Sequence, residues 1–87
     1  MKMEEQKIGE VIKFFGKIGV AAIQLSEGSL KVGDTIRIVG HTSDVSQVIE
    51  SMQVENANVQ EAGKGADIGL KVKERVREHD TVYKVAG

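Results

Sequence analysis

Alternation of apolar and polar residues divides the chain into short segments of strand length. β-Branched and aromatic residues are frequent in residues 7–15, and a second apolar segment follows at residues 20–25. In residues 35–39 two isoleucines alternate with polar side chains, which places both isoleucines on one face of a strand. The pattern predicts three strands, the first two forming a hairpin across the glycine-containing turn at residues 16–19.

The fourth predicted strand covers residues 45–55 and needs an irregularity. Its apolar positions change parity between Ile49 and Met52, so we expect a bulge near residues 50 and 51. The same apolar residues also fit helical spacing, which leaves a helix over residues 43–52 as the alternative. The strand is favoured because Val and Ile dominate the segment and strands flank it.

The last two predicted strands follow a loop at residues 56–66. Apolar residues at positions 68, 70 and 72 alternate with polar ones, and residues 81–85 form a short closing strand. Six strands joined by short turns predict an all-β fold, a six-stranded antiparallel β-barrel that is closed or nearly closed, rather than a sandwich. We expect residues 1–6 to be a flexible N-terminus and residues 7–87 to form a single domain.

Length, charge and cysteine content exclude several classes of protein. The 87 residues carry 12 basic and 13 acidic side chains, which suits one near-neutral domain and leaves no room for a two-domain enzyme. The absence of Cys excludes disulfides, thiolate metal sites and a thiol nucleophile. No apolar segment approaches the roughly 20 residues of a membrane helix, and the N-terminus lacks a signal-peptide core, so we expect a cytoplasmic protein without membrane contact.

None of the reactive side chains is spaced for catalysis or metal binding. The Gly-Lys-Gly run at residues 63–65 lacks both the earlier glycine and the following Ser or Thr of a phosphate loop, so a tight turn is favoured. His41 and His79 each have an Asp nearby but no third ligand at metal spacing. We therefore expect no enzyme activity, no cofactor and no metal site.

Basic residues concentrate after the fifth predicted strand. Four of them alternate at period two, and would share one face if the strand continued through them; two more lysines lie near the first hairpin. These candidate RNA-binding residues are Lys71, Lys73, Arg75, Arg77, Lys13 and Lys17. Such a stripe suits a phosphate backbone, whereas a solvated edge that discourages strand aggregation is the alternative, which the charges alone favour.

An acidic segment lies between Arg37 and Lys64. Its 26 residues contain four acids and no base. The acids are Asp44, Glu50, Glu55 and Glu61. This flank, or an exposed strand edge, is the surface expected for a protein partner.

Four segments of the chain resemble the β-barrel second domain of translational GTPases of the elongation factor Tu type. Residues 30–40, LKVGDTIRIVG, resemble its strand LKVGDxIxIxG. Residues 48–54 are similar to its VxSIQ strand, residues 62–70 to its AxxGDxVGL turn and strand, and residues 76–83 to its closing IxxGDV segment. The resemblance extends from about residue 8 to residue 85 and is greatest to small, stand-alone translation elongation factor-like proteins.

The resemblance implies a barrel with a binding role and no GTP hydrolysis. In elongation factors this barrel helps hold the acceptor end of aminoacyl-tRNA or contacts ribosomal RNA, so the implied function is a non-catalytic module contacting tRNA, rRNA or the ribosome. Because Met1 stands close before the first strand, we expect a chain complete without a GTPase domain.

Other functions remain open beside this one. Similar barrels are appended to collagenase-like peptidase-family proteins, so a protein–protein interaction module with no nucleic-acid role is the alternative. A small-molecule site in the barrel mouth is a third. The sequence departs from the family pattern at residues 66–67 and 79–80, where Ala-Asp and His-Asp replace Gly-Asp, changes that a turn can absorb.

Overall fold

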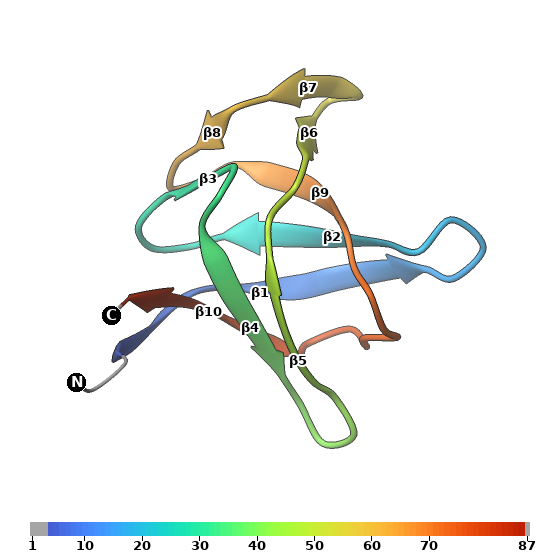
Figure 1. Ribbon diagram of the computed structural model, residues 1–87. Helices are drawn as coiled ribbons and strands as arrows, with labels where there is room; N and C mark the ends of the chain where they lie inside the picture. The colour runs from blue at the N-terminus through green and yellow to red at the C-terminus, as the bar shows by residue number, and fades with distance from the viewer. Residues whose placement is uncertain (1–3, 87) are drawn as a thin grey trace.

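The computed structural model describes residues 4–86, which form ten antiparallel strands and no helix (Figure 1). The strands are β1 (Glu4–Phe15), β2 (Val20–Leu25), β3 (Leu30–Lys31), β4 (Thr35–Val39), β5 (Asp44–Val48), β6 (Met52–Val54), β7 (Ala57–Val59), β8 (Glu61–Ala62), β9 (Asp67–Lys71) and β10 (Thr81–Ala86). Eight of them form one sheet in the order β5-β4-β10-β1-β2-β9-β6-β7, and β3 pairs with β8. The described part of the chain contains no helix that could span a membrane.

The predicted all-β antiparallel fold is confirmed, but the strand count differs. Each of the six predicted strands is present, as β1, β2, β4, β5 with β6, β9 and β10. The additional strands β3, β7 and β8 are only two or three residues long, and two of them lie in the segment predicted as a loop at residues 56–66. The alternative of a helix over residues 43–52 is wrong, because β5 begins this segment and β6 ends it.

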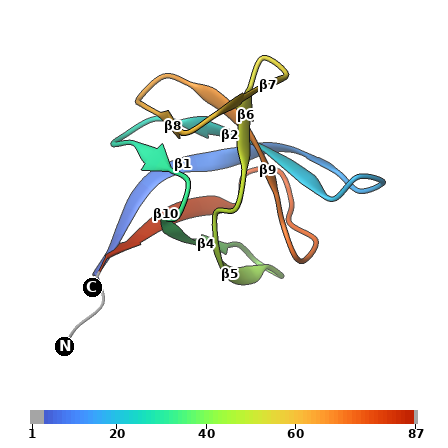
Figure 2. The same ribbon diagram turned by 45° about the horizontal axis from the view of Figure 1, so that its top comes forward.

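The sheet curls but does not close into a barrel, which corrects the predicted closure. β5 pairs with β4 at one end of the sheet, whereas β6 pairs with β9 near the other end. Figure 2 shows the chain passing from β5 to β6 between these two ends. The strand breaks at residues 49–51, where the parity change predicted an irregularity, because Ile49 and Met52 are both buried and two exposed residues separate them.

Alternating apolar residues from all the long strands build a single core. Ile36 and Ile38 of β4 are fully buried, as the sequence predicts, and face Ile23 of β2 and Leu70 of β9 within the same cluster. β1 keeps its apolar residues inward through register shifts after Lys7 and after Val11, which allow a twelve-residue strand to bend.

The first strand begins earlier than predicted. Residues 4–6 pair with residues 84–86 of β10, so the two described ends of the chain lie side by side (Figure 1). Residues 1–3 of the predicted flexible terminus lie outside the described residues.

The condition for a shared basic face is not met, since β9 ends at Lys71 and residues 72–80 are irregular. The Val72 amide donates to the Gly19 carbonyl at 2.9 Å, and Val76 is 1% exposed, so this segment folds over one end of the core. It ends in a turn where the buried Asp80 carboxylate accepts from the Arg77 amide at 2.9 Å.

His79 adopts a left-handed backbone in this turn, with φ of 73°. An L-residue in that region is strained by about 1–2 kcal/mol, whereas glycine gives up about 0.5–1 kcal/mol of chain entropy on folding. His79→Gly is therefore expected to raise the free energy of unfolding by about 0.5–1 kcal/mol, measured by urea denaturation. His79→Ala keeps a Cβ and is the control; equal stability of the two variants would show that the turn is unstrained.

Candidate functional site

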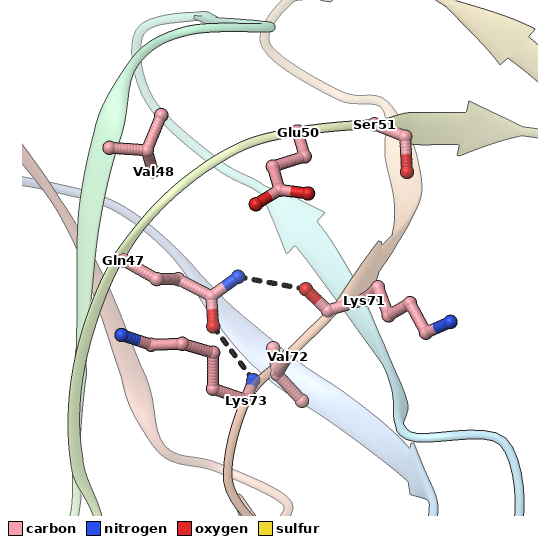
Figure 3. Close-up of a pocket in the computed structure, with 7 residues that line it drawn as sticks. All are labelled: Gln47, Val48, Glu50, Ser51, Lys71, Val72 and Lys73. Carbon is pink, nitrogen blue, oxygen red and sulfur yellow. Dashed lines mark hydrogen bonds between the residues drawn. The ribbon is translucent and has the colours of Figure 1, made fainter.

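A cleft of about 350 Å³ opens where the sheet fails to close, between β5 and the C-terminal end of β9 (Figure 3). Its lining residues are Gln47, Val48, Glu50, Ser51, Lys71, Val72 and Lys73. They come from the two segments that an unbroken barrel would join by backbone hydrogen bonds. The cleft is thus a direct consequence of the break in the fourth predicted strand.

The Gln47 side chain spans this gap. Its Nε2 donates to the Lys71 carbonyl at 2.8 Å, and its Oε1 accepts from the Lys73 amide at 2.9 Å (Figure 3). A residue of a neighbouring parallel strand makes the same pair of bonds, to residues one before and one after its partner. The Gln47 amide therefore occupies the position of a peptide group from a strand that is absent here.

β5 has one edge without a strand beside it. Ile49 exchanges backbone hydrogen bonds with Asp34 and Gly33 at 2.9 Å each, so its polar groups point toward β4. Because these directions alternate in an antiparallel ladder, the N–H and C=O groups of Ser46 and Val48 point away from β4, and Val48 lines the cleft. Within residues 4–86 no strand pairs with this edge.

Charges of both signs lie around the cleft. The Glu50 carboxylate is directed into it, and Lys71 and Lys73 flank it on the opposite segment (Figure 3). Val48 adds an apolar side chain that is 52% exposed. The lining therefore combines unpaired backbone, one exposed aliphatic side chain and a net positive charge.

The structure divides the predicted basic residues among separate places. Lys71 and Lys73 lie at the cleft, whereas Arg75 and Arg77 line a different hollow beside Phe14. The stripe does not form because the backbone leaves the extended conformation after β9.

The two outlying lysines lie on the first hairpin. The Lys13 ammonium sits 5.3 Å from the centre of the Phe15 ring, and Lys17 lies in the turn between β1 and β2. Both are exposed. The fold therefore groups four of the six residues as two separate pairs, Lys71 with Lys73 and Arg75 with Arg77, and not as one stripe.

An apolar groove of about 380 Å³ lies on the outer face of the sheet, where β2 pairs with β9. Ala22 is opposite Gly69, so the floor carries almost no side chain. Phe15 and Ile18 line the groove from the first hairpin and are 41% and 62% exposed. Its polar lining residues are Gln53, Glu55, Asn56 and Asp67. Outward positions of an antiparallel sheet are ordinarily polar when they face water.

Sequence reasoning missed this groove, although a signal was present. Val20 and Ala22 are apolar at the outward parity of β2, and Ile18 is apolar within a turn. A strand that is apolar on both faces is typical of a sheet covered on both sides. All of residues 20–25 except Gln24 are apolar.

One of the four acids of the acidic segment, Asp44, forms a paired contact with Arg37, whereas Glu50, Glu55 and Glu61 are exposed. The guanidinium donates to both Asp44 carboxylate oxygens at 2.9 Å and to Glu5 at 3.0 Å. Hydrogen bonding to Arg37 holds the pKa of Asp44 below its ordinary value of 3.8. Arg37 is thereby paired with one acid from the adjacent strand β5 and one from β1, which lies beyond β10.

This pairing predicts a pH dependence of stability. Because the pKa of Asp44 is lowered by folding, its contribution is complete above the ordinary value of 3.8 and is lost as pH falls through the lowered value. Asp44→Asn is expected to be less stable than the unmodified protein at pH 7 and to converge with it at acid pH, in urea titrations across this range. A difference in stability that stays constant with pH would contradict the prediction.

The described residues contain no group of three His, Asp or Glu side chains placed to hold a metal ion. Neither the cleft nor the groove contains a histidine. Their chemistry is that of surfaces that bind a peptide or a protein, through unpaired backbone in one case and apolar area in the other.

The comparisons with known families agree with the fold. The family model described as Elongation factor Tu domain 2 matches residues 19–82. Crystal structures of the C-terminal domain of a Geobacillus thermoleovorans protein, described as a U32 peptidase, superpose with TM-scores of 0.82 and 0.83 at 21% and 22% identity. These matches cover 88% and 91% of this chain and 96% and 91% of those domains.

Two curated relatives are more similar to this chain in sequence than the solved structures are. The chain is 43% identical over 83 residues to an uncharacterized protease of Methanocaldococcus jannaschii, covering 94% of this chain and 20% of the relative. It is 40% identical over 78 residues to a collagenase of Porphyromonas gingivalis, covering 88% of this chain and 22% of that protein. The chain therefore spans about a fifth of the length of the curated relatives it matches.

The predicted function in translation, with contacts to tRNA, rRNA or the ribosome, is wrong. The curated relatives are named as a protease and a collagenase, and the matching solved structures are C-terminal domains of a peptidase-family protein. The segments behind the prediction contain strands β3, β4 and β6, most of β9 and the first half of β10. They specify a fold that unrelated functions share.

Proposed function

We propose that this chain, which belongs to the elongation factor Tu domain 2 family, is a non-catalytic accessory domain that works with a U32-type peptidase catalytic region. One observation carries the proposal, namely 40–43% identity along nearly the whole chain to a fifth of two proteins named as proteolytic enzymes. A matching C-terminal domain has been crystallised by itself, which supports a unit that folds independently.

The outer-face groove supports docking onto the catalytic region. Phe15 and Ile18 are the exposed apolar side chains of the first hairpin that line the groove, and the Ala22–Gly69 floor lets another surface approach the backbone. Apolar patches of this kind mark interfaces with other domains. The occupant we assign is the catalytic region, because the remaining four fifths of the relatives are the neighbours of such a domain.

The test is a set of chimeras of the Methanocaldococcus jannaschii protease. Deleting its segment that matches this chain is expected to lower turnover of a protein substrate such as gelatin, and inserting this chain there is expected to restore it. The chimera with Ile18→Asp should lose that restoration, since a carboxylate on the groove wall would be buried at the interface.

Ile12→Asp is the matched control, because Ile12 is 42% exposed on β1 but does not line the groove. Circular dichroism of each isolated variant checks folding. Unchanged gelatin turnover after deletion of the segment would overturn the accessory role, and equal effects of the two Asp variants would overturn the docking face.

A further inference from the structure

We propose that the cleft between β5 and residues 71–73 binds the C-terminal end of an extended peptide, with the free carboxylate at Lys73. The inference rests on the proposed function for the origin of the ligand, since a peptidase releases peptides with new C-terminal carboxylates. The binding step itself requires only the described residues of this chain.

The unpaired edge of β5 is the first support. The N–H and C=O groups of Ser46 and Val48 point away from β4 along an edge with no strand partner, and an added strand satisfies such groups by main-chain hydrogen bonds. Side-chain pockets beside the added strand then supply selectivity. The exposed Val48 offers an apolar contact for a side chain of the peptide at this position.

Gln47 is the second support. Its amide already makes the two hydrogen bonds, to the Lys71 carbonyl and the Lys73 amide, that a peptide group of an inserted strand would make. The opposite wall of the cleft therefore presents a donor and an acceptor at strand spacing. In our proposal the peptide displaces the Gln47 side chain, which acts as an intramolecular competitor while the cleft is empty of peptide.

These hydrogen bonds also set the direction of the peptide. The Gln47 amide makes the hydrogen bonds that a strand parallel to residues 71–73 would make. Residues 71–73 continue the direction of β9, and β9 is antiparallel to β6. Because β6 continues the direction of β5, residues 71–73 run opposite to β5. A strand parallel to residues 71–73 is consequently antiparallel to β5, the more stable pairing. Its C-terminal end lies toward Lys73.

The charges agree with this direction. Glu50 follows the C-terminal end of β5, where the N-terminal side of the peptide would lie, and Lys73 is at the other end of the cleft (Figure 3). A carboxylate at Lys73 gains an opposite charge and stays away from Glu50. The lining thus favours a peptide with its negative end at Lys73 over the reverse orientation.

The probe is acetyl-Ser-Val-Thr-Val-Ser-Val with a free C-terminal carboxylate, titrated into the isolated ¹⁵N-labelled chain. We expect a dissociation constant below about 1 mM, with amide shifts concentrated at Ser46, Val48 and Lys73. The same peptide with a C-terminal amide should bind at least about fivefold more weakly, because it lacks the charge that Lys73 contacts. A free-acid peptide that causes no shifts at 5 mM would overturn the proposal.

Three variants separate the contributions. Lys73→Ser should abolish the preference for the free carboxylate, whereas Lys64→Ser, in an exposed turn that does not line the cleft, should preserve it. Gln47→Ala should bind up to about tenfold more tightly, since two hydrogen bonds of the competitor are removed. Weaker binding by Gln47→Ala would overturn the displacement, and an unchanged preference in Lys73→Ser would overturn the position of the carboxylate.

This experiment does not involve a catalytic region, so its outcome is independent of the chimeras. Absence of peptide binding together with restored gelatin turnover would overturn the inference alone. Peptide binding by the chain, together with unchanged gelatin turnover after deletion of the matching segment, would overturn the accessory role and leave the cleft as a peptide site.

Discussion

Gly9→Ala is expected to lower the free energy of unfolding by about 3 kcal/mol or more, because the added methyl group would overlap the backbone of the next strand. A Cβ at Gly9 would overlap the Gln24 carbonyl oxygen and lie 3.0 Å from its carbon and 3.2 Å from the Leu25 Cα. Gly9 is paired with Leu25 of β2 on one side and with Val82 of β10 on the other, so β1 cannot shift aside without breaking a ladder.

Urea denaturation followed by circular dichroism measures this loss. Gly69→Ala is the matched control, since a Cβ there has only the Val20 Cγ1 within 4 Å, at 3.7 Å. Its backbone is also compatible with alanine, which has less conformational freedom than glycine in the unfolded chain. We therefore expect Gly69→Ala to raise the free energy of unfolding by about 0.5 kcal/mol. A Gly9→Ala midpoint equal to that of the unmodified protein would contradict the close approach of β1 and β2.

Ile38→Ala is expected to be comparably damaging, at about 2–5 kcal/mol, because it leaves a cavity at the centre of β4. Ile38 is fully buried and lies opposite Val82 and Val45 on the two adjacent strands. A domain of 87 residues has a total stability of about 4–13 kcal/mol, so this single change removes a large part of it.

Two controls isolate the cavity. Ile38→Val should lose only about 1 kcal/mol, since one methylene group is removed. Ile12→Ala, at a side chain 42% exposed, should change stability by less than about 0.5 kcal/mol. A loss at Ile38 as small as that at Ile12 would show that β4 does not cross the core.

Much of the fold was predictable because local alternation reports which side chains face inward. Ile36 and Ile38 were placed on one face of a strand, and both are buried. The parity change between Ile49 and Met52 located the break between β5 and β6 to within a residue. Val72 is buried at the same parity as Ile68 and Leu70, as expected, but alternation did not show that the strand ends at Lys71 and that Val76 is buried in an irregular segment.

The candidate site was less predictable, because its parts are distant in sequence. Gln47 is a polar residue between Val45 and Ile49 at inward parity, which is a signal that something polar lies nearby. Its partners, the backbone groups of Lys71 and Lys73, are 24 and 26 residues away, and no periodicity connects them. Arg37 and Asp44 are only seven residues apart on consecutive strands, and their pairing depends on the register of β4 against β5.

The sequence by itself determined the all-β class, the core faces of the strands, the position of the break and the family, because these follow from local periodicity and short turn segments. Only the tertiary structure decided that the sheet stays open, that Gln47 spans the gap and that Phe15, Ile18 and Gly69 share an outer groove. Strand register sets these features, and register depends on hydrogen bonds and packing between segments far apart in the chain. The recognition surfaces therefore belong to the folded sheet.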